Sequence, residues 1–275
     1  MNPVVCEALF LAGEEGGRFC LVTRPRGASI GAVLYVPPFA EELNKTRRMA
    51  AMAARAFASH GWTVVQLDLF GTGDSAGDFG DATWSHWLAD LDLAWSWVRD
   101  KVPGRTVLWS LRGGALLGSD WARARGVDCP WLLWQPVMTG RQHLTQFLRL
   151  KSAAAMLNAA DAQRTTLELR NVLAAGTAVE VAGYTLNAAL VQGMEAAQLQ
   201  MAPGRCCPLA VLEVSSNERL TPSPALERFC RQIDAEGVSG TASVVAGPAF
   251  WQTVEIEEAP ALVAASQTVL DGWAA

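Results

Sequence analysis

The sequence predicts an α/β protein, with a mostly parallel central sheet and helices on both of its faces. Short continuous apolar runs at 31–36 and 62–68 alternate with amphipathic segments at 44–60 and 84–100. Strands buried on both faces and joined by amphipathic helices form a parallel sheet between two helix layers. The chain has 275 residues and is 51% hydrophobic, which is enough for one core, so we expect a single domain over residues 1–275.

The N-terminal residues predict an antiparallel pair of strands ahead of the parallel sheet. Apolar and polar residues alternate over 4–11 and 18–24, and the stretch between them, 13–17, is rich in glycine. Alternation on both sides of a glycine-rich turn is typical of a hairpin. The first two strands should therefore be neighbours in the sheet.

Each later element follows from its own local pattern. The run at 31–36 ends in two prolines, so a loop follows it, and the helical pattern of 44–60 stops at a glycine. The remaining predicted strands are 106–109, 132–134, 181–184, 208–214 and 240–245, and the remaining helices are 113–125 and 259–273. Between about 140 and 203 the periodicity is largely helical, which predicts a helical cap inserted over the sheet.

The composition excludes several classes of function. Charged residues make up 18% of the chain and the formal net charge is −5, without a long run of like charge, so nucleic acid is not an expected partner. The apolar runs are far shorter than the roughly 20 residues that span a bilayer. The N-terminus lacks the basic start and apolar core of a signal peptide, so we expect a cytoplasmic protein without a membrane partner.

The six cysteines do not predict a metal or redox centre. They are scattered along the chain, with one adjacent pair, Cys206 and Cys207, and no CxxC spacing. In a cytoplasmic protein such cysteines are expected to be thiols. We therefore predict no metal site and no cofactor.

One turn carries the sequence signal of the α/β-hydrolase fold and also departs from it. That fold places its nucleophile in a Gly-x-Ser-x-Gly turn between a strand and a helix, flanked by small residues. Here the turn at 110–114 is Ser-Leu-Arg-Gly-Gly, so Arg112 stands at the nucleophile position. A guanidinium stays protonated at neutral pH and cannot attack a carbonyl, so a Ser-His-Asp triad is not intact.

The other members of a triad are also in question. A shift of register would make Ser110 the nucleophile, but Arg112 would then stand where a glycine is wanted. An ordinary hydrolase that uses Ser110 therefore remains a less favoured alternative to the two readings of the function given below. A triad base follows the last strand, yet none of the three histidines, His60, His86 and His143, lies beyond position 143. We expect these histidines to be structural or exposed.

Acidic residues at two places are candidates to accompany Arg112. Glu218 follows the penultimate strand, where a triad acid would stand, and either pairs with Arg112 or is a solvated loop residue. Glu41 and Glu42 belong to a loop that in hydrolases carries an oxyanion-hole amide. The two carboxylates could serve in acid–base chemistry, but pairing with a cationic side chain is the plainer expectation. The candidate cationic partners are Arg112, Lys45 and Arg47.

The predicted site lies at the carboxyl edge of the sheet, beside the N-terminus of the helix that follows Arg112. The partial positive charge of a helix N-terminus adds to that of the guanidinium, so the position prefers an acyl or anionic ligand. We predict Arg112 and Glu218 as catalytic residues. The predicted substrate-binding residues are Phe39, Ala40, Glu41, Glu42, Leu111, Gly113, Trp251 and Gln252.

Longer segments are specific to one family. They are VPPFAEELNKTRRM at 36–49, DLFGTGDSAGDF at 68–79, WLLWQPV at 131–137, VAGYTL at 181–186 and FWQTVEI at 250–256. These segments resemble the exosortase A system-associated hydrolases of the second type, from bacteria that make exopolysaccharide and sort proteins with a PEP-CTERM tail. The resemblance covers nearly the whole chain. It implies a hydrolase fold, a leucine and an arginine at the elbow, and a gene neighbourhood with an acyl carrier protein.

Two readings of the function follow. In the first, the protein binds an acyl or anionic, carrier-linked substrate at a non-standard site in an exosortase A-associated pathway. In the second it is a pseudoenzyme, a non-catalytic partner of an acyl carrier protein or of an active paralogous hydrolase. Eleven tryptophans would suit an apolar interface of that kind, or a dimer. The sequence leaves open whether the chain is an enzyme.

Overall fold

The computed structural model describes residues 3–154, 159–202 and 204–274, and within them strands form an eight-stranded sheet in the order β1-β2-β4-β3-β5-β6-β9-β10. The antiparallel neighbours are β1 (Val4–Gly13) with β2 (Gly16–Pro25), and β2 with β4 (Trp62–Leu67). The parallel part continues through β3 (Gly31–Val36), β5 (Arg105–Leu111), β6 (Trp131–Trp134), β9 (Leu209–Ser215) and β10 (Gly240–Ala246). The predicted hairpin and mostly parallel sheet are confirmed.

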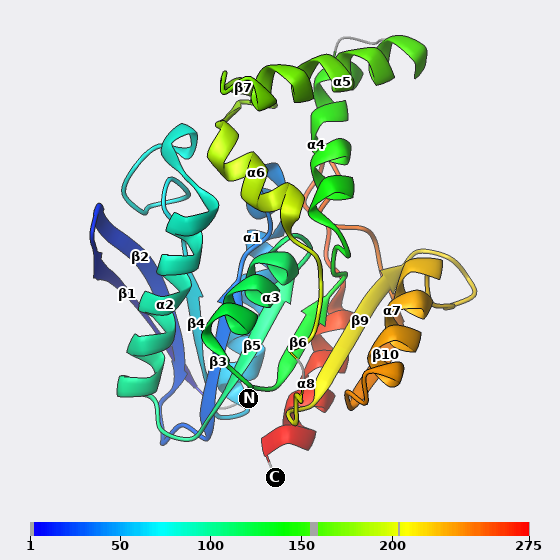
Figure 1. Ribbon diagram of the computed structural model, residues 1–275. Coiled ribbons are helices and arrows are strands. Elements are labelled where there is room, and N and C mark those ends of the chain that lie inside the picture. The colour runs from blue at the N-terminus through cyan, green and yellow to red at the C-terminus, as the bar shows by residue number, and fades with distance from the viewer. Residues whose placement is uncertain (1–2, 155–158, 203, 275) are drawn as a thin grey trace.

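Helices cover both faces of this sheet (Figure 1). On one face lie α1 (Glu41–Ser59) and α8 (Pro260–Ala274), and on the other lie α2 (Trp84–Lys101), α3 (Gly114–Arg125) and α7 (Pro224–Ala235). A short 3-10 turn, η1 (Phe79–Asp81), precedes α2. The two helix layers are those that the sequence pattern predicts.

Strand β3 shows why a continuous apolar run forms a central strand. Its six residues are all buried. Leu34 and Val36 pack in the core shared with α2 and α3, whereas Val33 and Tyr35 pack in the core shared with α1 and α8. Because side chains alternate between the faces of a strand, a strand covered on both faces needs an apolar residue at every position.

The segment between β6 and β9 lies beyond the carboxyl ends of the parallel strands (Figure 1). It contains α4 (Gly140–Ala154), α5 (Ala159–Ala174), β7 (Val179–Val181), β8 (Tyr184–Leu186) and α6 (Ala188–Ala196). The single strand predicted at 181–184 is wrong. Ala182 and Gly183 have φ angles of 50° and 82°, which turn the chain back into an antiparallel pair. We call this segment the cap.

Two helices differ from the prediction. α1 begins at Glu41 and not at residue 44, so the acidic pair lies in its first turn, where the helix dipole favours negative charge. α7 was not predicted, although Ser223 caps it by accepting a hydrogen bond from the Leu226 amide and Pro224 begins it. Among the described residues no helix combines the length and apolar character that crossing a bilayer requires.

Candidate ligand-binding site

The turn between β5 and α3 has the tight geometry of a nucleophile elbow. Arg112 has a φ of 52°, a left-handed conformation that is strained for a residue with a β-carbon. Its amide donates to the Trp134 carbonyl at 3.0 Å, and its carbonyl accepts from the Val137 amide at 3.3 Å. These bonds hold the side chain of Arg112 at the carboxyl edge of the sheet.

Gly114 explains why the elbow needs small residues. A β-carbon at this position would lie 2.5 Å from the carbonyl oxygens of Val36 and Pro37. The helix α3 therefore begins in direct contact with the end of β3. The elbow keeps its close packing although its central residue is an arginine.

The guanidinium of Arg112 forms an ion pair with Glu42 from the first turn of α1. Its Nε donates to Glu42 Oε1 at 3.0 Å, and a terminal nitrogen lies 3.0 Å from the same oxygen. The two side chains are 11% and 8% exposed, so the pair is shielded from water. The indole of Trp251 lies 5.3 Å from the guanidinium carbon, a cation–π contact.

Burial controls the ionisation of the acidic residues in this turn. It raises the pKa of Glu42 to about 6, against the opposing effect of Arg112. Burial also raises the pKa of Glu41, an effect that Lys45 and Arg112 oppose. The second oxygen of Glu42 has no hydrogen-bond partner among the described residues, so it is ready to accept a proton or a hydrogen bond.

A buried histidine from the cap faces this oxygen. His143 on α4 is 4% exposed, and neither ring nitrogen has a hydrogen-bond partner among the described residues. Its Nε2 lies 3.9 Å from Glu42 Oε2, which is too far for a hydrogen bond. Burial, and secondarily Arg112, lower the pKa of His143 to about 3, so the imidazole is neutral at physiological pH.

These side chains surround a cavity of about 280 Å³ between α1, the cap and the loop after β10. We call it the Arg112 cavity. Its walls combine charged groups with aromatic and aliphatic side chains. The lining residues are Phe39, Glu41, Glu42, Lys45, Arg112, His143, Gln146, Phe147, Leu150, Trp251 and Gln252.

The structure brings together most, but not all, of the residues predicted for the site. The predicted residues that line the cavity are Phe39, Glu41, Glu42, Arg112, Trp251 and Gln252. Ala40, Leu111 and Gly113 are buried behind its wall and do not line it. Ala40 is instead the N-cap of α1, with a φ of 51°.

Of the two alternatives for Glu218, the structure has the solvated loop residue and not the partner of Arg112. Glu218 is exposed on the loop after β9, and no ion pair described here joins it to Arg112. The buried acid of this region is Glu213, which accepts hydrogen bonds from the Ser223 amide at 2.8 Å and hydroxyl at 2.7 Å. Glu213 is thus occupied in holding the start of α7, and Glu42 takes the place next to Arg112.

The cap contributes cavity residues that were not predicted from the sequence. His143, Phe147 and Leu150 have helical spacing on α4 and line the cavity together with Gln146. The spacing of three and four residues along α4 was the available signal.

Lys45 lies one turn further along α1 than Glu41 and Glu42. It was expected as a cationic partner for them, and it also lines the cavity.

Ser110 does not face the cavity. It is 1% exposed, its hydroxyl has no hydrogen-bond partner among the described residues, and a β-carbon on Gly118 of α3 would lie 3.3 Å from its oxygen. Since Arg112 lies two residues further along and beyond the strand end, the hydroxyl of Ser110 is directed at the body of α3. This placement argues against Ser110 as a nucleophile.

Metal ligation finds no support in the described residues. No group of three or more His, Cys, Asp or Glu side chains among them is placed to hold a metal ion. The described cysteines are free thiols, and burial raises the pKa of Cys20 and of Cys129 to about 12. Such thiols are poor nucleophiles.

One family model matches part of the sequence. Residues 20–141, from β2 to the start of the cap, match the model of the X-Pro dipeptidyl-peptidase S15 family. The match includes the elbow but covers less than half of the chain. No curated protein matches the sequence.

Solved structures resemble the chain over almost its whole length. Est1E from Butyrivibrio proteoclasticus, solved with ferulic acid bound, has a TM-score of 0.71 and 13% identity, with 96% of this chain and 98% of that chain covered. XC6422 from Xanthomonas campestris, an α/β serine hydrolase without a lid, has a TM-score of 0.59 and 17% identity, with 99% and 98% covered.

A mammalian protein shows the same likeness. Mouse alpha/beta hydrolase domain-containing protein 10 has a TM-score of 0.56 and 15% identity, with 97% of this chain and 98% of that chain covered. At these identities the likeness concerns the fold. The elbow, the sheet order and these neighbours together show that the protein has the α/β-hydrolase fold.

Proposed function

We propose that this protein binds an acyl or anionic ligand in the Arg112 cavity and does not use a serine nucleophile. The observation that carries the proposal is the position of Arg112, whose guanidinium stands at the nucleophile position of the elbow and lines a cavity of about 280 Å³. A permanently charged donor at this place attracts an oxygen anion but cannot form an acyl-enzyme. Any turnover would therefore proceed without a covalent serine intermediate.

The contacts of Arg112 support a carboxylate or acyl oxygen as the group it binds. Glu42 occupies one edge of the guanidinium, through Nε and one terminal nitrogen. The other terminal nitrogen is available to donate to a ligand oxygen, because a guanidinium offers five N–H donors in a planar fork. The N-terminus of α3, two residues further on, adds partial positive charge.

The remaining walls support an apolar chain or ring on that ligand. Phe39, Phe147 and Leu150 also line the cavity. The rings of Phe39 and Phe147 pack edge to face, with centroids 5.1 Å apart. Burial of apolar ligand surface against such residues supplies binding energy, while Arg112 fixes the orientation.

The proposal extends to a pathway through the family resemblance. The segments at 36–49 and 250–256, which carry the resemblance, supply Glu42 and Trp251 to the cavity. We propose that the ligand belongs to an exosortase A-associated pathway of PEP-CTERM and exopolysaccharide bacteria. In that setting it would be an acyl group presented in the cytoplasm on an acyl carrier protein, and the chain a pseudoenzyme with respect to serine chemistry.

Calorimetric titration with octanoate and with its neutral analogue octanamide tests the proposal. Wild-type protein should bind octanoate with 1:1 stoichiometry. Arg112→Met keeps an unbranched, flexible side chain but removes its charge and its donors, so it should weaken octanoate binding at least tenfold, as expected for one lost charged hydrogen bond, and change octanamide binding little. Arg55→Met, at an exposed position of α1, is the matched control. Equal octanoate affinity in wild type and Arg112→Met would contradict the proposal.

A second candidate function, a partner subunit for an active hydrolase, is favoured by one surface. Val254 and Ile256, on the loop after Trp251, are 97% and 66% exposed. Two apolar side chains this exposed and two positions apart on one loop are a candidate contact for a partner. Replacing both by serine should abolish co-elution with an active paralogous hydrolase while octanoate binding remains. Unchanged co-elution of the double variant would exclude this loop as the interface.

A further inference from the structure

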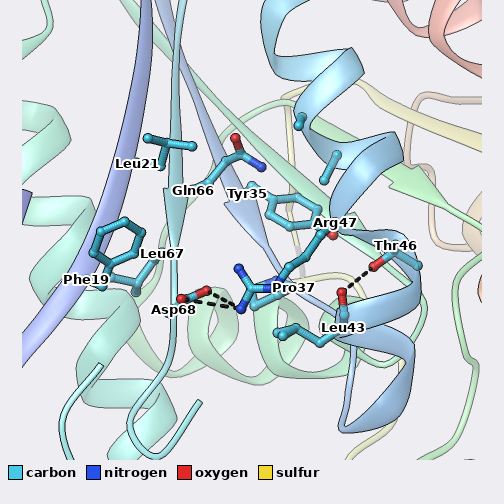
Figure 2. A pocket seen from close by; sticks show the side chains of 12 residues that line it. Phe19, Leu21, Tyr35, Pro37, Leu43, Thr46, Arg47, Gln66, Leu67 and Asp68 are labelled. Atoms are coloured by element: carbon cyan, nitrogen blue, oxygen red, sulfur yellow. Dashed lines mark hydrogen bonds and ion pairs between the residues drawn. The ribbon is translucent and has the colours of Figure 1, made fainter. Parts of the chain in front are cut away.

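A second cavity, which shares no lining residue with the Arg112 cavity, lies between α1 and the neighbouring strands (Figure 2). Its volume is about 180 Å³, and its walls come from α1 and from the adjacent strands β2, β3 and β4. Figure 2 shows Phe19 and Leu21 of β2 on one side and Leu43 and Arg47 of α1 on the other. We call it the Tyr35 cavity.

Two buried polar groups in this cavity have no hydrogen-bond partner among the described residues. They are the hydroxyl of Tyr35, a residue that is only 5% exposed, and the side-chain oxygen of Gln66. Tyr35 and Gln66 are register partners in adjacent parallel strands, so their side chains rise from the same face of the sheet. A buried polar group without a partner is unfavourable, and a ligand that supplies the hydrogen bond removes this penalty.

The polar neighbours of Tyr35 and Gln66 are engaged mainly elsewhere, although Thr46 lies close enough to the Tyr35 hydroxyl to oppose, in part, the rise that burial causes in its pKa. The Thr46 hydroxyl, which also lines the cavity, donates to the Leu43 carbonyl at 3.2 Å. Arg47 is directed at Asp68, with 3.4 Å between the nearest nitrogen and oxygen (Figure 2). The Gln66 oxygen therefore has an acceptor site left for a molecule in the cavity, and the Tyr35 hydroxyl, which meets no geometric hydrogen-bond criterion with a described residue, can also bind one.

The chemistry of the cavity favours a neutral ligand with a hydroxyl group. Burial raises the pKa of Tyr35, so its hydroxyl keeps its proton and can donate or accept. The oxygen of Gln66 needs a donor, and a ligand hydroxyl can act in both roles. Arg47 and Asp68 balance each other's charge at the wall, so neither sign of ligand charge is favoured.

The size and apolar walls define the rest of the ligand. Phe19, Leu21 and Leu43 supply apolar surface. A cavity of about 150 Å³ is large enough for benzene in a well-studied lysozyme variant, so about 180 Å³ accommodates one ring with one small substituent. We propose that the Tyr35 cavity is a binding site, separate from the Arg112 cavity, for a small neutral hydroxylated molecule such as a phenol or a short-chain alcohol.

Titration of the whole protein with phenol tests this site. Phenol should bind with 1:1 stoichiometry, and Ala51→Leu should abolish binding because the larger side chain fills the cavity from α1. Ala124→Leu, the same change at an exposed position of α3, is the matched control and should leave phenol affinity unchanged. Tyr35→Phe should weaken binding about tenfold through the loss of one hydrogen bond.

Further measurements keep the test decisive. A thermal melt of each variant checks that it folds. If Ala51→Leu does not fold, Tyr35→Phe and Gln66→Leu take its place, because each removes one hydrogen-bonding partner of phenol and should weaken its binding. Octanoate at saturation should leave phenol binding unchanged, because the two cavities are separate. Lack of phenol binding, competition with octanoate, or unchanged affinity in the cavity variants would each overturn the proposal.

Discussion

Arg112 Nε donates to Glu42 Oε1 at 3.0 Å and thereby joins the elbow after β5 to the first turn of α1. The two residues are 70 positions apart in the sequence, and both side chains are nearly withdrawn from water. The carboxylate that accompanies the elbow arginine thus comes from the loop-to-helix junction after β3 and not from the acid position after β9. This pair places opposite charges in the wall of the Arg112 cavity, which Glu41 and Lys45 also line.

Removing one member of this pair should destabilise the fold strongly. Glu42→Leu or Arg112→Met alone leaves a buried charge without its partner, and we expect each to lower the free energy of unfolding by about 3–5 kcal/mol. The double variant, with two apolar side chains, should recover most of that loss. Urea unfolding provides the comparison.

The exposed pair Arg24 and Glu7, with side chains 51% and 47% exposed, is the control for this cycle. Its single variants, Arg24→Met and Glu7→Leu, should change stability by less than about 1 kcal/mol. Equal losses in the two pairs, or no recovery in the Arg112 and Glu42 double variant, would show that the elbow pair is not coupled.

Glu42 should make stability depend on pH in a direction opposite to most carboxylates. Its pKa is about 6 in the folded protein, above the ordinary 4.5, so between these values the folded state binds more protons than the unfolded state. Its stabilising contribution is fully present below pH 4.5 and is lost as the pH rises through 6, by about 2 kcal/mol.

Comparison of wild type with Glu42→Gln isolates this effect. The glutamine can still accept from Arg112 but cannot titrate, so contributions from other groups cancel in the difference. The stability of wild type relative to Glu42→Gln should fall between pH 4.5 and 7 in urea titrations. A difference that stays constant or rises over this interval would contradict the raised pKa.

Gly114 should be intolerant of a β-carbon. Gly114→Ala would place that carbon 2.5 Å from two carbonyl oxygens at the end of β3, so the elbow must shift, and we expect a loss of at least about 2 kcal/mol. Gly272→Ala in α8, where nothing lies within 4 Å, should be neutral or stabilising by up to about 1 kcal/mol. Thermal melts of the two variants give the contrast, and similar melting temperatures would argue against the described elbow packing.

Ser110 should be dispensable for stability. Its hydroxyl is buried without a partner, so Ser110→Ala should be neutral or stabilising by about 1 kcal/mol. Ser119 on α3 is the control, because its hydroxyl donates to the Gln200 carbonyl at 2.7 Å and accepts from the Gln200 amide at 3.0 Å. Ser119→Ala should cost about 1–2 kcal/mol in the same urea unfolding experiment. A loss at Ser110 as large as that at Ser119 would mean that its hydroxyl has a partner.

The fold was predictable because its signals are local. The continuous apolar run of β3 and the helical spacing of α2 each follow from what one segment must bury, and the predicted bounds of β3 agree with the structure. The start of α1 was placed three residues late because acidic residues after two prolines were interpreted as a loop. The turn that splits β7 from β8 depends on backbone angles at Ala182, which periodicity does not reveal.

The site was only partly predictable because it is assembled from distant segments. The identity of Arg112 and the absence of a histidine after β10 are visible in the sequence. Glu218 was chosen by analogy with the acid position of a triad, whereas contact geometry selects Glu42. The role of His143 in the cavity wall depends on how α4 packs over the elbow, and no local pattern specifies this packing.

We propose that the elbow holds an arginine for non-covalent binding and offers no serine nucleophile. Intact-mass measurement of the native protein after incubation with a fluorophosphonate shows whether any serine reacts. We predict an unchanged mass, in wild type and in Ser110→Ala alike. A mass increase in wild type that maps to Ser110 and disappears in Ser110→Ala would show that Ser110 is a nucleophile after all.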